Sequence, residues 1–366
     1  MLSKSFRAAA AAFILGTATV AACSVALTVS AEAAARPAVG RALQEAIREA
    51  GAGNLSAAHS SVATAEGMSG LTAGDRAAID QVKQYIAQKA GSSGGGGCAG
   101  LYLKGDYRGV IALHARDAQC MTLTAQAYYL TRDFTGCTRY IRDNFGGGAS
   151  ENTLVMQQRC AYESQDNEGQ RQALEQLVSR TNKPEYWSQL LDTASSTKGL
   201  SDHGTLDIYR LKLLTGSLTK GEDYNLLAQL ALQMGFAAES AAVIQKATAA
   251  KVQMGGRIGA LLAMANGQAA ANAANAARIA ATGNGDALVK LGEDAWGQGH
   301  FPDALKYVQA GIAKGVSDKD NAQIRLGMAY LGTGQKDQAA RAFDRANTDP
   351  KQKVIAHLWS IYARTH

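Results

Sequence analysis

The six histidines are the first residues to test for chemistry, because imidazole acts as a general base and a metal ligand near neutral pH. They stand at positions 59, 114, 203, 300, 357 and 366. No two are four residues apart and no His-Glu-x-x-His motif occurs, so one helix cannot offer two metal ligands. The run Ser201-Asp202-His203 contains the residue types of a hydrolase triad. Chain neighbours do not adopt triad geometry, and the run is typical of a helix N-cap.

The sequence also lacks the residue patterns that phosphate binding and acid–base catalysis need. The chain has 39 glycines, but no Gly-x-x-x-x-Gly-Lys-Ser/Thr loop is among them. The adjacent carboxylates Glu222-Asp223 and Glu293-Asp294 are interpreted as solvated helix faces, since paired acid and base work requires a shared pocket. We therefore predict a protein that is not an enzyme and binds no metal or cofactor.

The cysteines favour disulfides over zinc. Beyond Cys23, the chain has Cys98, Cys120, Cys137 and Cys160, with gaps of 22, 17 and 23 residues and no Cys-x-x-Cys pair. An even number in an exported chain predicts two disulfides. Three pairings are possible. Neighbours along a helical array come close in space, which favours Cys98 with Cys120 and Cys137 with Cys160.

The first residues have the pattern of an export signal. Lys4 and Arg7 precede an apolar run over 8–29, and Ala31-Glu32-Ala33 has the small residues that a signal peptidase recognises. This predicts a cleaved signal peptide and a periplasmic location. The alternative is an outer-membrane lipoprotein acylated at Cys23, because Val20-Ala21-Ala22-Cys23 resembles a lipobox. A membrane is expected as a partner only in that case.

Composition predicts helices. The chain is 46% hydrophobic but only 6% aromatic, with four prolines, and strong helix formers dominate it. The net charge of +6 is modest for this chain length, and basic residues are interspersed with acidic ones. The densest basic stretch, over 132–142, contains Asp133 and ends beside Asp143, which is typical of a solvated helix face. We expect no nucleic-acid partner.

A repeat near the C-terminus indicates the architecture. Leu291-Gly292, Gly299, Ala304 and Val308 recur 35 residues later as Leu326-Gly327, Gly334, Ala339 and Phe343. Each block predicts two amphipathic helices with a turn at the second glycine. In the second block, the small residues Ala339 and Ala346 allow the paired helices to approach closely, while Phe343 fills the space beside them.

With Tyr330 and Asp349-Pro350, the second block resembles the tetratricopeptide repeat. The stretches 206–213, 225–247 and 356–364 are similar to a group of exported tetratricopeptide proteins of proteobacteria that carries no known activity. The resemblance implies an all-α, right-handed solenoid of antiparallel helix pairs, some of them degenerate. A further pair is expected over 153–179, and a helix over 351–364 is expected to cap the last pair.

The same organisation predicts the domain boundaries. Gly91 to Gly97 is glycine- and serine-rich and predicts a linker or loop, and the Ala/Asn-rich tract over 266–285 predicts a thin helix. The predicted segments are 1–33 signal peptide, 34–90 N-terminal helices, 91–97 linker, 98–200 disulfide-containing pairs, 201–283 repeats with the Ala/Asn tract, and 284–366 C-terminal pairs with the capping helix.

The resemblance also implies a function: the first helices of successive pairs line a concave groove that holds a peptide segment or helix of a cell-envelope protein. We therefore expect a protein–protein interaction scaffold; the lipoprotein alternative would instead be a subunit of an envelope assembly complex. Trp296 is expected either as an interface anchor or as core against the neighbouring pair. The residues carried over to the groove are Thr122, Gln126, Tyr129, Asn225, Gln229, Gln233, Glu293, Trp296, Arg325 and Met328.

Overall fold

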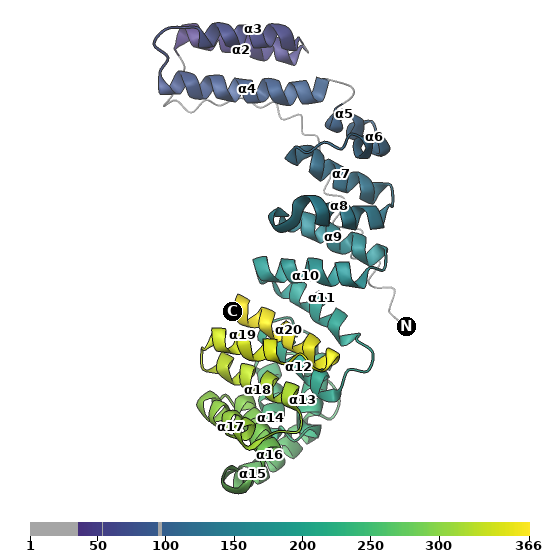
Figure 1. The fold of residues 1–366 in the computed structure, drawn as a ribbon, viewed down its shortest axis with the longest axis vertical. Coiled ribbons are helices and arrows are strands. Elements are labelled where there is room, and N and C mark those ends of the chain that lie inside the picture. Colours follow the sequence, from purple (N-terminus) through teal and green to yellow (C-terminus); the bar gives the residue numbers. More distant parts are fainter. Residues whose placement is uncertain (1–35, 53, 94–96) are drawn as a thin grey trace. The chain divides into compact units, whose positions relative to one another are not determined.

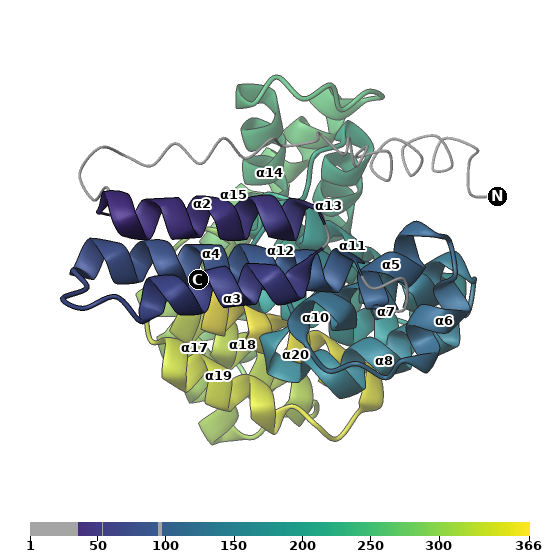
Figure 2. The ribbon, with the colours of Figure 1, turned by 90° about the horizontal axis from the view of Figure 1, so that it is seen from above.

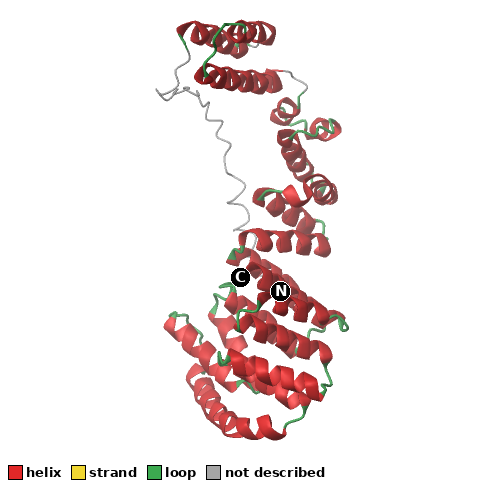
Figure 3. Cartoon of the chain, turned by 60° about the vertical axis from the view of Figure 1, so that its left-hand side comes forward, coloured by secondary structure: helices red, strands yellow, loops and turns green. Residues whose placement is uncertain are grey.

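A computed structural model describes residues 36–52, 54–93 and 97–366, and every regular element in these ranges is a helix (Figure 3). The all-α prediction is therefore confirmed. The signal-peptide residues and Cys23 lie outside the described ranges. None of the described helices combines the length and apolar character needed to cross a membrane. The helices are α2 (Pro37–Gly51), α3 (Leu55–Glu66), α4 (Ala73–Ser93), α5 (Cys98–Leu103), α6 (Tyr107–Ala112), α7 (Ala118–Leu130), α8 (Phe134–Phe145), η1 (Gly146–Gly148), α9 (Glu151–Glu163), α10 (Asn167–Thr181), α11 (Pro184–Ser195), α12 (Asp202–Leu214), α13 (Gly221–Gln233), α14 (Ala237–Ala249), α15 (Ile258–Thr282), α16 (Gly285–Gly297), α17 (Phe301–Lys314), α18 (Lys319–Gly332), α19 (Lys336–Arg345) and α20 (Pro350–Thr365).

The chain divides into two compact units, Met1–Ala127 and Tyr128–His366, which we call unit 1 and unit 2. The boundary falls inside α7. In unit 1, α2, α3 and α4 pack side by side (Figure 2) around Val39, Val62 and Ile86. The helix α4 continues to Ser93, so the first three residues of the predicted linker are helical, while 94–96 lie outside the described ranges. A second small core in unit 1 contains Cys98 and Val110.

Unit 2 is built of antiparallel helix pairs, of which α9/α10, α13/α14, α16/α17 and α18/α19 are the clearest. Side chains cap the starts of several helices: Asp166 accepts a hydrogen bond from the backbone N–H of Gly169 at 2.8 Å, and Asp318 accepts one from Asn321 at 2.9 Å. Turns between paired helices use glycine in the left-handed region, as at Gly334 with φ 77°. The turn at Gly334 is where the repeat predicts it.

The close approach of paired helices depends on glycine. A Cβ added at Gly327 would lie 2.4 Å from the ring of Phe343, and one at Gly292 would lie 2.6 Å from Val308. These two contacts are equivalent across the 35-residue repeat. The close helix approach predicted beside Phe343 is therefore confirmed, and Val308 has the same role in the first block.

The predicted helices over 153–179 and in the Ala/Asn tract are also present, as α9/α10 and α15. Only Ala265 is buried within α15, which agrees with the prediction of a thin helix.

The last helix, α20, does more than cap its neighbours. It packs against α18 and α19 as predicted, and also against α10 and α12 (Figure 1). Trp359 is fully buried and Trp187 of α11 belongs to the same core. Unit 2 therefore closes through α20, because this last helix packs back against α10 and α12. The expectation of a cap on the last pair alone is incomplete.

Candidate partner-binding surface

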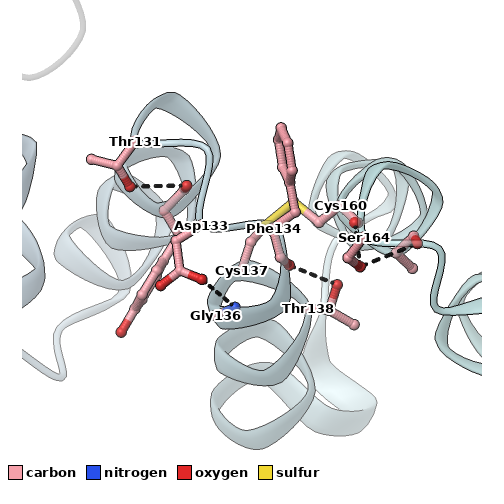
Figure 4. The surroundings of a disulfide bond; sticks show 10 residues. Thr131, Asp133, Phe134, Gly136, Cys137, Thr138, Cys160 and Ser164 are labelled. Atoms are coloured by element: carbon pink, nitrogen blue, oxygen red, sulfur yellow. Dashed lines mark hydrogen bonds between the residues drawn. A yellow bond between two sulfur atoms is a disulfide. The ribbon is translucent and has the colours of Figure 1, made fainter.

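The first part of unit 2 contains a disulfide that joins two helices (Figure 4). Cys137 of α8 and Cys160 of α9 are bonded, with an S–S distance of 2.02 Å. Asp133 caps α8 by accepting the backbone N–H of Gly136 at 2.8 Å, and Ser164 donates its hydroxyl to the carbonyl of Cys160 at 2.9 Å. One predicted disulfide is thus confirmed, and α8 and α9 are covalently linked.

The second predicted disulfide is not formed. Cys98 and Cys120 of unit 1 are free thiols, with Cys98 buried and Cys120 half-buried. Burial, together with the contacts with Cys98 and Asp117, raises the pKa of Cys120 to about 12. The helical array brings these two cysteines together as predicted, but they remain reduced.

Beside the disulfide, four side chains form a surface that we call the Tyr–Arg face: Tyr129 of α7, and Val155, Arg159 and Tyr162 of α9. The α9 residues are spaced by four and three positions, which places them on one side of the helix. Arg159 lies over the ring of Tyr129, with its guanidinium carbon 5.3 Å from the ring centroid. Tyr162 is 63% exposed and Val155 is 37% exposed.

The composition of this face suits recognition of a protein. Tyrosine and arginine are enriched among the residues that dominate binding energy in interfaces. Arg159 has no ion pair with any residue that the structure describes, so its charge is available. Cys160 directly follows Arg159, and its disulfide to α8 fixes the turn of α9 that carries the face.

The predicted groove residues fall into two groups. Tyr129 belongs to the Tyr–Arg face, and Thr122 and Gln126 precede it on α7 at spacings of seven and three. Gln229 and Gln233 are exposed on α13, where Gln229 donates to Asn225 at 3.1 Å. These residues can contact a partner. Their role in binding stays a prediction.

Glu293, Arg325 and Met328 are placed differently. Each is at most 2% exposed, so the prediction that they line an open groove is wrong. Trp296 is half-buried and packs on Trp359, with ring centroids 5.9 Å apart, and its indole N–H donates to the carbonyl of Met328 at 3.0 Å. Of the two expectations for Trp296, the structure shows the core residue.

Glu293, Arg325 and Met328 are buried because α12 lies across the inner surface formed by α16 and α18. Its residues Asp207 and Arg210 are buried and reach α14, α16 and α18. Arg210 donates to Glu239 at 2.7 Å and to Glu293 at 2.6 Å. Arg325 donates to Asp207 through both terminal nitrogens. We call these five residues the charge cluster.

The charge cluster stabilises the charged forms of Arg210 and Glu293. Burial opposes the charge on Arg210, but Glu239 and Glu293 outweigh it and raise the pKa of the guanidinium. Burial likewise opposes the charge on Glu293, but Arg325 and Arg210 outweigh it and hold the pKa of this carboxyl well below its usual range. His203 borders the charge cluster and contacts both Glu293 oxygens, at 3.0 and 3.1 Å. Ser201 caps α12 as predicted, by accepting from Gly204 at 3.1 Å.

The charge cluster had one signal in the sequence. Asp207 and Arg210 stand three residues apart within the mostly apolar stretch 206–214. Both charges therefore lie on a helix whose other side chains are largely hydrophobic. Their four-helix environment follows only from the fold. Among the described residues, no group of three or more His, Cys, Asp or Glu side chains is arranged to hold a metal ion.

Solved structures similar to this chain include the TPR domain of P58(IPK), with 14% identity over 89% of this chain and 97% of that chain and a TM-score of 0.24. A tetratricopeptide repeat protein from Parabacteroides merdae ATCC 43184 has 11% identity, covers 88% of this chain and 98% of that chain, and has a TM-score of 0.22. Yeast Tom70 has 11% identity, with 89% and 81% covered and a TM-score of 0.19.

No protein-family model matches the chain, and no curated protein matches it. Within this chain, the contacts of Gly292 with Val308 and of Gly327 with Phe343 recur at the same positions of two successive helix pairs. By that packing, the chain is an all-α helical-repeat protein.

Proposed function

We propose that this protein is a non-catalytic scaffold that binds another protein through the Tyr–Arg face. The observation that carries the proposal is the combination of an exposed Tyr162 and an unpaired Arg159 on a helix fixed by the Cys137–Cys160 disulfide. A rigid surface loses little conformational entropy on binding, which favours affinity. The inner surface of α16 and α18 does not take this role, because α12 occupies it.

The proposed partner is a segment of a cell-envelope protein, and the proposed location is the periplasm. Support comes from the signal-peptide pattern over 1–33 and from the disulfide, since such bonds persist in oxidising compartments. The alternative is an outer-membrane lipoprotein subunit of an assembly complex, supported by the lipobox-like sequence ending at Cys23. The intact mass of protein purified from its native envelope separates the two, because only the lipoprotein retains Cys23 with acyl chains.

The interface is tested by photo-crosslinking in the native envelope. A photoreactive phenylalanine analogue replaces Tyr162 in the full chain, and a matched protein carries it at Tyr307, which belongs to α17. We expect a discrete cross-linked protein from position 162 and not from 307. Adding Arg159→Glu should remove that product, because it reverses the charge of the face without touching the core.

Cross-linking that is equal at both positions, or that survives Arg159→Glu unchanged, would contradict the proposed interface. Mass spectrometry of a specific product would identify the partner. Circular dichroism of each variant checks that the helices are intact.

A further inference from the structure

Unit 2 contains a cavity of about 260 Å³ between the first turns of α16 and α18 and the turn that precedes α14. One wall is apolar and rigid, because Phe236, Val289 and Ala322 are at most 4% exposed. Glu293 and His203 also line the cavity, and the His203 ring lies beside that of Phe236, with centroids 6.2 Å apart. The cavity is below the usual range of cofactor and drug sites, roughly 300–1,000 Å³. It therefore has room for one small molecule or one side chain.

The five residues of the charge cluster do not balance by themselves, and the further basic group His203 contacts Glu293 at 3.0 Å. The charge cluster contains three carboxylates, of Asp207, Glu239 and Glu293, and two guanidiniums, of Arg210 and Arg325. All five side chains are at most 7% exposed. An uncompensated buried charge is costly, so a cation that arrives at this site gains the attraction that the carboxylates already offer.

The two oxygens of Glu293 differ in their partners. Oε1 accepts hydrogen bonds from Arg210 and His203 and forms an ion pair with Arg325 at 3.0 Å. Oε2 accepts only from His203 among the described residues. A carboxylate oxygen can accept two hydrogen bonds, so a 98% buried side chain lining the cavity has a vacant acceptor position.

The other charged residues that line the cavity are mostly acidic. Asp286 and Asp318 line it together with Glu293, and the basic residues among its described lining are Lys290 and His203. Lys290 extends across Phe236, with Nζ 5.8 Å from the ring centroid. An anion would meet three carboxylates here, whereas a cation meets one ammonium on an exposed, flexible side chain.

We propose that this cavity binds a primary ammonium group on a short aliphatic chain, with the ammonium at Glu293 Oε2 and the methylenes along Phe236 and Val289. The apolar wall matches methylene groups and the carboxylate matches the ammonium, as lysine side chains show when they bury their stems. The ammonium group belongs either to a free diamine or to the lysine side chain of another protein. The proposal does not depend on the Tyr–Arg face.

Calorimetric titration of the full chain tests this site with four probes. Pentane-1,5-diamine represents a free amine, and acetyl-Gly-Lys-Gly-amide represents a lysine side chain. Pentan-1-ol lacks the charge, and glutarate reverses it. We expect the two amines to bind and the alcohol and the dianion not to bind. The tighter of the two amines identifies the source.

Three variants test which sign of charge the cavity prefers. Asp286→Asn keeps the acceptor for the backbone N–H of Ser317, at 2.9 Å, and should weaken amine binding several-fold by removing charge. Lys290→Met should strengthen it on the order of 3- to 10-fold, because a like charge is removed. Asp303→Asn on α17 removes an exposed carboxylate away from the cavity and should leave binding unchanged.

Absence of amine binding in the wild-type chain would overturn the proposal. So would amine binding that Asp286→Asn and Lys290→Met leave unchanged, which would indicate a different site. Binding of glutarate that Lys290→Met abolishes would overturn it in favour of an anion site. None of these outcomes bears on the cross-links at position 162, so the two proposals fail separately.

Discussion

At the scale of single residues, the close packing of paired helices in unit 2 depends on glycines, which have no side chain. Gly327 lies against Phe343, which is 1% exposed and has little freedom to move. Gly267 of α15 is also helical, but a Cβ there would meet nothing within 4 Å. The two glycines therefore make opposite predictions for the same substitution.

Gly327→Ala should destabilise unit 2 by about 1–3 kcal/mol, because the new methyl group overpacks the α18/α19 contact. Gly267→Ala should stabilise it by about 0.5–1 kcal/mol, because alanine loses less backbone entropy in a helix. Denaturant unfolding followed by tryptophan fluorescence measures both, since Trp187, Trp296 and Trp359 all belong to unit 2. Equal effects at the two positions would show that α18 and α19 do not approach as described.

Glu293 predicts how the stability of unit 2 depends on pH. Its pKa in the folded chain lies well below the ordinary value of 4.5, because Arg325 and Arg210 outweigh burial. The unfolded chain therefore binds more protons than the folded chain in acid. The free energy of unfolding should be highest above pH 4.5 and fall as the pH drops below it.

Fluorescence-monitored unfolding between neutral and acidic pH gives this slope. Glu293→Gln should be less stable at neutral pH, because it leaves the arginines without a counter-charge, and its stability should fall less steeply in acid. A variant slope as steep as that of the wild type would assign the acid sensitivity to other carboxylates.

At the scale of helices, the Cys137–Cys160 bond connects α8 of one pair to α9 of the next. The cysteines are 23 residues apart, and closing a loop of that size stabilises a fold by about 3 kcal/mol. Replacing both with alanine should lower the stability of unit 2 by about that amount. Denaturant unfolding with and without a reductant measures it.

The matched control is the double replacement of Cys98 and Cys120, which are free thiols in unit 1. It should leave the fluorescence transition of unit 2 unchanged, and reductant should have no effect on the 137/160 double variant. A reductant effect that persists in that variant would indicate a second disulfide.

The helix α20 is the element that closes unit 2. Trp359 is fully buried and stacks on Phe343, with ring centroids 6.0 Å apart. Trp359→Ala should destabilise unit 2 by about 3–5 kcal/mol through the cavity it leaves. Lys353→Ala on the exposed side of α20 should change stability by less than about 0.5 kcal/mol. A small effect at Trp359 in unfolding experiments would contradict closure by α20.

At the scale of the whole molecule, the two units have separate cores. Proteins with several compact parts often unfold in more than one step. Far-ultraviolet circular dichroism, which detects helices in both units, should show two transitions on heating. Tryptophan fluorescence should show only the transition of unit 2, and a single shared transition by both probes would show that the units unfold together.

Local patterns in the sequence were sufficient for the helices and their pairing. The 35-residue repeat predicted the α16/α17 and α18/α19 pairs, and the proximity of neighbouring helices favoured the Cys137–Cys160 bond, although the same argument favoured a Cys98–Cys120 bond that does not form. The cap of α12 by Ser201 was likewise predicted, because a cap acts between neighbours in the chain.

The site was harder to predict, because it depends on contacts between residues far apart in the chain. Glu293 and Arg325 have the positions of groove residues, and only the path of α12 shows that their groove is filled. Arg210 meets Glu293 across 83 residues, and no periodicity encodes such a pairing. The sequence by itself determined the helices and the pairs, whereas the tertiary structure decided which faces are buried, because closure through α12 and α20 depends on the sum of many small rotations between pairs.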